Sequence, residues 1–176
     1  MNIRLKRTPG IYVVGFMAVG KSTVGRRLAH RLGWSFFDLD DEIERAEGVK
    51  IADIFDRRGE PDFRRIETEI LRQHIRWIER GRPSVLALGG GAFAEPVNRE
   101  LVMSNGIAVW LDCPFEIVKQ RVGENSDRPL ARDPERFAEL YRSRRELYSA
   151  ADVCVSIESD DPDKTVDAIL QNPMLR

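Results

Sequence analysis

One segment of the chain has the residue types and the spacing of a phosphate-binding loop. Residues 15–23 read Gly-Phe-Met-Ala-Val-Gly-Lys-Ser-Thr, which fits G-x-x-x-x-G-K-[ST] between an apolar run and a helical pattern. Such glycines let backbone N–H groups point into one concavity, and the following helix adds the positive end of its dipole. We therefore predict that the chain binds a nucleoside triphosphate, with Lys21 reaching its β- and γ-phosphates and the Ser22 hydroxyl binding Mg²⁺. The nucleotide-binding residues predicted in this loop are Gly15, Ala18, Val19, Gly20, Lys21, Ser22 and Thr23.

Two aspartates, Asp38 and Asp40, close the second apolar run. Alternation along a strand would place both on one side, at the carboxyl end of the sheet where α/β proteins bind ligands. The third apolar run ends in glycines rather than in an acidic residue. Asp38 is therefore the candidate to hold Mg²⁺ through water, and Asp40 is the candidate to orient an acceptor hydroxyl. The alternative is that these aspartates, and Asp41 above all, cap the helix that follows.

Three consecutive glycines, Gly89 to Gly91, follow a predicted buried strand. Each glycine loses much conformational entropy on folding, so a run of three favours a close approach of the backbone to a ligand. A plain turn is the alternative, because turns also select glycine.

Two arginines fall where amphipathic helices should be apolar. Arg64 shares a helical face with Glu67, and Arg144 follows Tyr141 by three residues on a stripe that continues to Tyr148. A guanidinium on a buried stripe needs an anion, and its planar fork matches a carboxylate. Glu67, one turn away, is placed to orient Arg64. The alternative is that both arginine side chains extend to water.

The segment 123–133 is polar, has no helical or strand period and carries turn residues. We interpret it as a mobile segment between two helices. Arg128 or Arg132 would then reach the transferred phosphate when the segment closes. A solvated loop arginine is the alternative in each case.

The elements that must position these residues are short apolar runs alternating with longer segments of helical period. This alternation predicts a parallel sheet with helices on both faces, a three-layer α/β fold. No repeat, low-complexity tract or linker divides the chain, so residues 1–176 are predicted to form a single domain. The predicted buried strands are 11–14, 35–37, 84–88, 107–111 and 153–157. The predicted helices are 22–32, 63–78, 134–148 with Asp133 as N-cap, and one that opens at Asp161-Pro162.

The composition excludes several classes of protein. Lys and Arg number 28 against 29 Asp and Glu, a net charge of −1, which argues against nucleic acid as a partner. Two cysteines and two histidines are too few for a disulfide scaffold or a metal centre built on them, and they indicate the reducing cytoplasm. No apolar stretch approaches the roughly 20 residues of a membrane span, so no membrane association is expected.

Together these motifs, in this order, resemble those of the shikimate kinase family. The resemblance extends from Ile11 to about Leu170. Beyond the phosphate loop it rests on Phe37-Asp38-Leu39-Asp40 with Glu42, Ile51-Ala52-Asp53-Ile54-Phe55, Phe63-Arg64-Arg65-Ile66-Glu67, Leu88-Gly89-Gly90-Gly91, Arg128-Pro129-Leu130, and Arg144 before Leu147-Tyr148.

The resemblance implies a P-loop kinase fold similar to that of nucleoside monophosphate kinases, with a five-stranded parallel sheet in the order 2-3-1-4-5. It implies transfer of the γ-phosphoryl group of ATP to the 3-hydroxyl of shikimate, a step toward chorismate and the aromatic amino acids. The expected products are shikimate 3-phosphate and ADP, and the expected cofactor is Mg²⁺. A cytoplasmic monomer is expected, with a shikimate-binding subregion at about 40–70 and a lid at about 123–133.

The same resemblance assigns roles to single residues. Asp40, Arg64, Gly90 and Arg144 would bind shikimate. Arg128 would be the lid arginine and would also contact the nucleotide, and Arg121 would lie against adenine. The catalytic residues would be Lys21, Asp40 and Arg128, and the metal would be held by Ser22 and Asp38. Arg145 is a competing alignment for Arg144, but Arg145 does not join the apolar stripe.

Two departures from the family and two competing functions remain. The family's phosphate loop often has glycine where this chain has Ala18, so unaltered loop geometry is not predicted. The loop near the last strand is acidic, with Glu158, Asp160 and Asp161, which leaves its adenine contacts unassigned.

Another kinase of this fold, for gluconate or a nucleotide, is the nearest alternative to a shikimate kinase. A non-catalytic module that senses an aromatic acid is the alternative from a different class.

Overall fold

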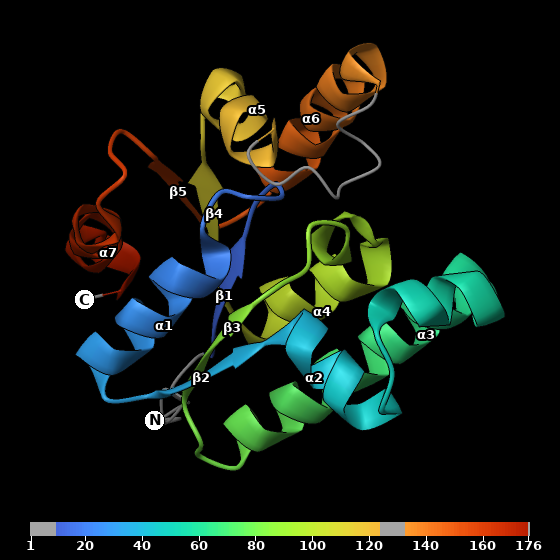
Figure 1. Ribbon diagram of the computed structural model, residues 1–176. Helices are drawn as coiled ribbons and strands as arrows, with labels where there is room; N and C mark the ends of the chain where they lie inside the picture. Colours follow the sequence, from blue (N-terminus) through green and yellow to red (C-terminus); the bar gives the residue numbers. More distant parts are fainter. Residues whose placement is uncertain (1–9, 124–132, 176) are drawn as a thin grey trace.

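A five-stranded parallel sheet forms the centre of the domain (Figure 1). The computed structural model describes residues 10–123 and 133–175. The strands are β1 (Gly10–Val14), β2 (Ser35–Asp38), β3 (Ser84–Ala87), β4 (Gly106–Asp112) and β5 (Val153–Ser156). They lie in the order β2-β3-β1-β4-β5, and every neighbouring pair is parallel. The expected fold class and strand order are therefore confirmed.

The burial of each strand follows its place in the sheet. All residues of β1 and β3 are buried, because both strands have a neighbour on each side. In β2 no residue is fully buried, and in β5 buried and exposed residues alternate. The prediction of five buried strands is wrong for these two, because they are the edges of the sheet.

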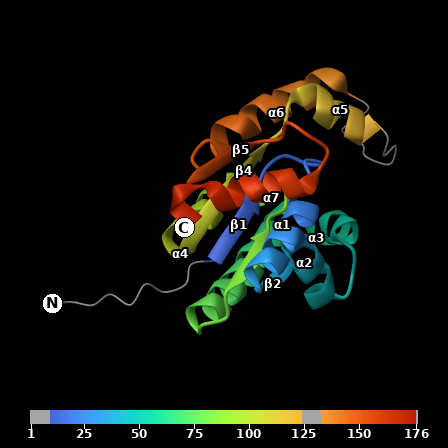
Figure 2. The same ribbon diagram turned by 90° about the vertical axis from the view of Figure 1, so that its left-hand side faces the viewer.

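Helices cover both faces of the sheet, as the alternation of elements predicts. In Figure 2, α1 (Lys21–Leu32) and α7 (Pro162–Gln171) lie side by side in front of the sheet. The helices α3 (Ile51–Glu79), α4 (Pro96–Asn105) and α6 (Pro134–Tyr148) pack on the opposite side. Asp133 caps α6 as predicted, and Asp161 caps α7; each accepts a hydrogen bond from a backbone N–H of the first turn.

Two helices around the acidic motif differ from the prediction. β2 ends at Asp38, and α2 (Leu39–Glu47) begins at the next residue, so Asp40 belongs to a helix. The alternation argument for Asp38 and Asp40 is therefore wrong. Helix α3 begins at Ile51 instead of residue 63, and Gly59 interrupts it with φ 79° and ψ 170°. Glycine adopts this backbone without steric strain, and Pro61, two residues after the kink, needs no hydrogen-bonded N–H, so a helix resumes there.

Helices α4 and α5 (Phe115–Gly123) are additional elements that no predicted segment covers. Their apolar periodicity is weak: α4 buries Val102 and the polar Asn98, and α5 buries Val118 and Val122. Within residues 10–123 and 133–175, no helix combines the length and the apolar character that a membrane crossing requires.

The parallel arrangement gathers the predicted site segments at one edge of the sheet. The phosphate loop follows β1, Asp38 ends β2, and the glycine run follows β3. These three strands are neighbours, with Val13 opposite Ala87 and Asp38 opposite the same Ala87. Ligands of open α/β sheets bind at such carboxyl ends, so the fold places the candidate residues where a site is expected.

Candidate active site

The phosphate loop makes a tight turn between β1 and α1. Gly15 and Gly20 adopt φ angles of +147° and +93°, and a Cβ on Gly15 would lie 2.9 Å from the carbonyl oxygen of Leu111. Lys21 Nζ donates a hydrogen bond to the carbonyl oxygen of Phe16 at 2.8 Å, which holds the ammonium group against the loop. The loop, the start of α1 and the glycines after β3 line a cavity of about 310 Å³. The predicted phosphate site is thus a preformed concavity beside a lysine.

Ala18 carries the strain of this loop. Its φ is +61°, and it is the one non-glycine residue with positive φ among residues 10–123 and 133–175. A left-handed conformation costs an L-residue about 1–2 kcal/mol. The loop of this chain therefore keeps a conformation that glycine would adopt more easily.

We expect Ala18→Gly to raise the free energy of unfolding by about 0.5–1 kcal/mol, since the relief of strain exceeds the entropy that glycine loses on folding. Urea denaturation with an unchanged m-value would measure the gain. Ala168→Gly, in the interior of α7 and exposed, is the control, and it should lower stability by about 1 kcal/mol. A loss of stability in both variants would contradict the assignment of strain to Ala18.

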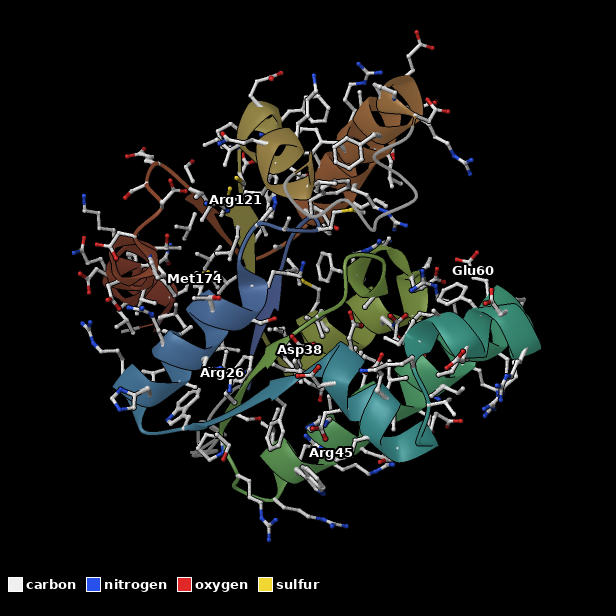
Figure 3. The ribbon with its side chains drawn as sticks, in the orientation of Figure 1. Arg26, Asp38, Arg45, Glu60, Arg121 and Met174 are labelled. Atoms are coloured by element: carbon white, nitrogen blue, oxygen red, sulfur yellow. The ribbon has the colours of Figure 1, made fainter. Side chains whose placement is uncertain are left out.

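Asp38 contacts two neighbours at once, at the junction of β2 and α2 (Figure 3). Its Oδ1 accepts a hydrogen bond from the backbone N–H of Asp40 at 3.0 Å, which caps α2. Its Oδ2 accepts a hydrogen bond from the Ser22 hydroxyl. Capping is thus confirmed for Asp38 rather than for the exposed Asp41. Because the two oxygens have different partners, the cap leaves one oxygen beside Ser22, the other predicted metal ligand.

Asp40 lines the same cavity from the first turn of α2. Burial raises the pKa of its carboxyl, the neighbouring Asp38 raises that pKa further, and Lys21 acts in the opposite direction. A carboxylate with a raised pKa is a better proton acceptor near neutral pH. Asp40 is therefore suited to accept a proton from an attacking hydroxyl.

The three glycines after β3 differ in what a side chain at each position would meet. A Cβ on Gly89 would lie 2.6 Å from Asp40 Oδ1, and a Cβ on Gly91 would lie 2.5 Å from Arg64 Nη2. A Cβ on Gly90 would meet only the backbone nitrogen of Met17, at 3.8 Å. Glycine at positions 89 and 91 thus leaves room for the side chains of Asp40 and Arg64. The open space beside Gly90 leaves room for a ligand to approach the backbone, as predicted from the sequence.

Arg64 is surrounded by carboxylates. Its Nη1 donates a hydrogen bond to Glu67 Oε2 at 2.9 Å, which confirms the predicted orienting contact. Glu60, labelled in Figure 3, lies 3.4 Å from Nη2, and Glu95 lies 3.7 Å from Nε. The Nε atom is buried and has no hydrogen-bond partner among the residues that the structure describes. The guanidinium is therefore held mainly by one buried carboxylate, that of Glu67.

Glu67 is itself part of a buried polar network that the sequence does not reveal. Burial raises the pKa of Glu67, and the charge of Arg64 acts in the opposite direction. Asn98 Nδ2 donates to Glu67 Oε2 at 3.3 Å, and the Thr68 hydroxyl donates to Asn98 Oδ1 at 2.7 Å. Glu67 could be noticed as a charge within an apolar pattern, but no signal marks Asn98, because α4 has little periodicity.

Arg144 and Arg145 have separate surroundings. Arg145 is exposed, pairs with Asp112 at 2.6 Å and lies over the ring of Trp110. Arg144 is half-buried and acts electrostatically on Tyr148, whose hydroxyl donates to the carbonyl oxygen of Gly90 at 2.5 Å. Arg144 is therefore the arginine on the side of the glycine run, as the apolar stripe predicts.

Arg121 lies on the other side of the phosphate loop, and Figure 3 labels it at α5. Its Nη1 donates to the carbonyl oxygen of Ala18 at 3.3 Å, and its Nη2 pairs with Asp160 at 2.6 Å. Together with Pro162, these residues line a cavity of about 270 Å³ that continues from the loop. The pair with Asp160 also gives the acidic loop after β5 a contact to Arg121.

The predicted lid falls largely outside the described residues. Gly123 ends α5 and Asp133 caps α6, whereas Arg128 and Arg132 lie in 124–132. In the part of the chain that is described, no cluster of three or more His, Cys, Asp or Glu side chains could hold a metal ion. The two predicted metal ligands, Ser22 and Asp38, are hydrogen-bonded to each other and line the cavity of the phosphate loop.

The chain is similar to proteins of one family over nearly its whole length. The family model described as shikimate kinase matches residues 17–173. The shikimate kinase of Persephonella marina is 40% identical over 161 residues, which cover 91% of this chain and 96% of that protein. A solved structure of the Acinetobacter baumannii shikimate kinase in complex with shikimate has a TM-score of 0.82 at 38% identity, covering 93% of this chain and 91% of the other. A gluconokinase from Sinorhizobium meliloti covers 92% and 90% with a TM-score of 0.53, but at 18% identity this likeness concerns the fold alone.

Proposed function

The chain belongs to the shikimate kinase family, and from this membership we propose how its own residues transfer the γ-phosphoryl group of ATP to the 3-hydroxyl of shikimate. The observation that carries the proposal is the glycine run after β3. One backbone segment lies between the half-buried carboxyl of Asp40, which lines the cavity of the phosphate loop, and the guanidinium of Arg64. A substrate that offers a hydroxyl to one and a carboxylate to the other matches this arrangement.

The nucleotide side of the reaction belongs to the phosphate loop. Backbone N–H groups and Lys21 would bind the phosphates, and Arg121 would contact the base from the adjoining cavity. Ser22 and Asp38 would hold Mg²⁺, which supplies positive charge to the phosphate oxygens when it is bound. Lys21 lies within hydrogen-bond distance of the loop carbonyl, so a short movement would release it to a phosphate.

Residues of α2, α3 and α6 would bind the acceptor of the phosphoryl group, shikimate. Asp40 would accept the proton of the 3-hydroxyl, which raises the nucleophilicity of that oxygen. Arg64 and Arg144 would bind the carboxylate of shikimate, and Gly90 would allow the ring to approach the backbone. These contacts orient the hydroxyl toward the phosphate cavity, and orientation contributes a large share of the rate in phosphoryl transfer.

A coupled assay of ADP release tests the assignment of substrate, with shikimate, quinate and gluconate compared at equal concentrations. We expect the highest kcat/KM for shikimate and no turnover when ATP is omitted. A higher kcat/KM for gluconate would support the alternative kinase, and binding of shikimate without any ADP release would support the non-catalytic module.

We expect Arg64→Ala and Arg144→Ala each to weaken shikimate binding by at least about 1.5 kcal/mol, or about tenfold, because each removes a charge-assisted contact to the carboxylate. Isothermal titration with shikimate and with its methyl ester measures this effect. The ester lacks the charge and should bind wild type weakly and the variants no worse. Equal binding of acid and ester by wild type would instead mean that the arginines serve the fold.

We also propose that the enzyme works as a monomer in the cytoplasm. Cys113 is buried, Cys154 is exposed, and both are free, as is usual in a reducing compartment. Size-exclusion chromatography with light scattering at assay concentration would measure the mass.

A further inference from the structure

We propose that Asn98 and Thr68 are positioning residues for Arg64, acting through the buried carboxylate of Glu67. The inference rests on the proposed role of Arg64 in binding shikimate. It adds two residues, from α4 and α3, that never touch the substrate but determine where the guanidinium lies.

The network is a chain of hydrogen bonds from a half-buried hydroxyl to the site. Thr68 Oγ1 donates to Asn98 Oδ1 at 2.7 Å, Asn98 Nδ2 donates to Glu67 Oε2 at 3.3 Å, and Arg64 Nη1 donates to the same Oε2 at 2.9 Å. Glu67 is 1% exposed and Asn98 is 0% exposed. Buried polar groups are costly unless they are hydrogen-bonded, so each member of this chain depends on the next.

The Thr68 hydroxyl decides which way the Asn98 amide faces. A carboxylate oxygen only accepts hydrogen bonds, so the NH₂ end of Asn98 must face Glu67. This orientation leaves the amide oxygen on the side of Thr68, where it needs a donor, and the hydroxyl supplies one. Without that hydroxyl the amide would lose its orienting bond and its donor to Glu67 would be fixed less firmly.

Two competing carboxylates make the position of Glu67 important. Glu60 and Glu95 are 64% and 42% exposed, and they lie 3.4 Å and 3.7 Å from Arg64. Exposed ion pairs of this kind contribute little to stability, but they are available whenever the main partner moves. If Glu67 shifts, the guanidinium follows it or turns toward Glu60 and Glu95, and its terminal nitrogens no longer lie against Gly91 of the glycine run.

Steady-state kinetics on the full chain test the proposal with four variants. Asn98→Leu removes both amide contacts at similar volume, and it should raise the KM for shikimate about tenfold while the KM for ATP stays within twofold. Thr68→Val keeps the shape of the side chain without the hydroxyl and should raise the shikimate KM about threefold. Thr68→Ser restores the hydroxyl and should return the KM to the wild-type value. Asn105→Ala, which removes an amide that donates to the carbonyl oxygen of Leu101 within α4, is the control and should change neither KM.

The pair Thr68→Val and Thr68→Ser decides the question even if Asn98→Leu fails to fold. Unchanged shikimate KM in Thr68→Val, or equal losses in both Thr68 variants, would overturn the inference. A parallel rise of both KM values with a lower Tm would also overturn it, because a merely structural role predicts that pattern. Arg64→Ala separates this failure from failure of the proposed function: if Arg64→Ala leaves shikimate binding intact, the assignment of Arg64 itself is wrong.

Discussion

Replacing Asp40 by asparagine is expected to lower kcat by about 10²–10⁴-fold while making the folded protein more stable. Asparagine keeps the shape of the side chain but cannot accept the proton of the acceptor hydroxyl. Burial and the nearby Asp38 raise the pKa of Asp40, which means that the fold disfavours its ionised form. Removing that charge therefore removes a destabilising group together with a catalytic one.

The stability gain should depend on pH in a defined direction. A carboxyl whose folded pKa lies above its unfolded value of about 3.9 destabilises the fold increasingly as pH rises through that interval and fully above it. The gain from Asp40→Asn should thus be largest at neutral pH and vanish below about pH 4. Urea denaturation at pH 4 and pH 7 measures this difference. Asp41→Asn, exposed on the same turn, is the control and should show little change. A less stable Asp40→Asn protein at pH 7 would contradict this reasoning.

The two aspartates should separate in a magnesium titration. Asp38→Asn is expected to raise the Mg²⁺ concentration needed for half-maximal activity, because one of its oxygens lies beside Ser22. Asp40→Asn should leave that concentration nearly unchanged and lower the maximal rate. Identical titration curves for both variants would mean that the assigned roles are wrong.

Gly89→Ala is expected to lower kcat by about 10²-fold, since a misplacement of about 1 Å in a positioning group has effects of this size. The new methyl group would lie 2.6 Å from Oδ1 and 3.3 Å from Cγ of Asp40, so the carboxyl must move away. The atoms that clash belong to the end of a side chain, so activity should fall more than stability.

Gly91→Ala provides the matched comparison. Its methyl group would displace the guanidinium of Arg64, with contacts of 2.5 Å and 2.9 Å to the two terminal nitrogens. This variant should mainly raise the shikimate KM, whereas Gly89→Ala should mainly lower kcat. Initial-rate measurements over a range of shikimate concentrations distinguish the two. The same loss in kcat for both would contradict separate roles for the neighbouring side chains.

The sheet and the phosphate loop of this protein are predicted from its sequence better than the boundaries and the packing of the helices around them. The strand order follows from the resemblance, and the phosphate loop and the pairing of Arg64 with Glu67 follow from local spacing. The early start of α2 is less predictable, because Phe37-Asp38-Leu39-Asp40 alternates like a strand although Asp38 caps a helix. The network of Thr68 and Asn98 is not predictable, since its two residues are 30 positions apart and join helices whose packing depends on the whole fold.

A ribosome making this chain releases β1 long before the strands that pair with it. Ser84, where β3 begins, lies 70 residues after Val14, and β4 begins later still. At about 5–20 residues per second, the apolar residues of β1 wait roughly 4–14 s without a partner. Such non-local parallel pairing is slow to form, and unpaired apolar strands aggregate. Chains truncated before β4 would therefore carry the complete phosphate-loop motif and still lack the scaffold that shapes it.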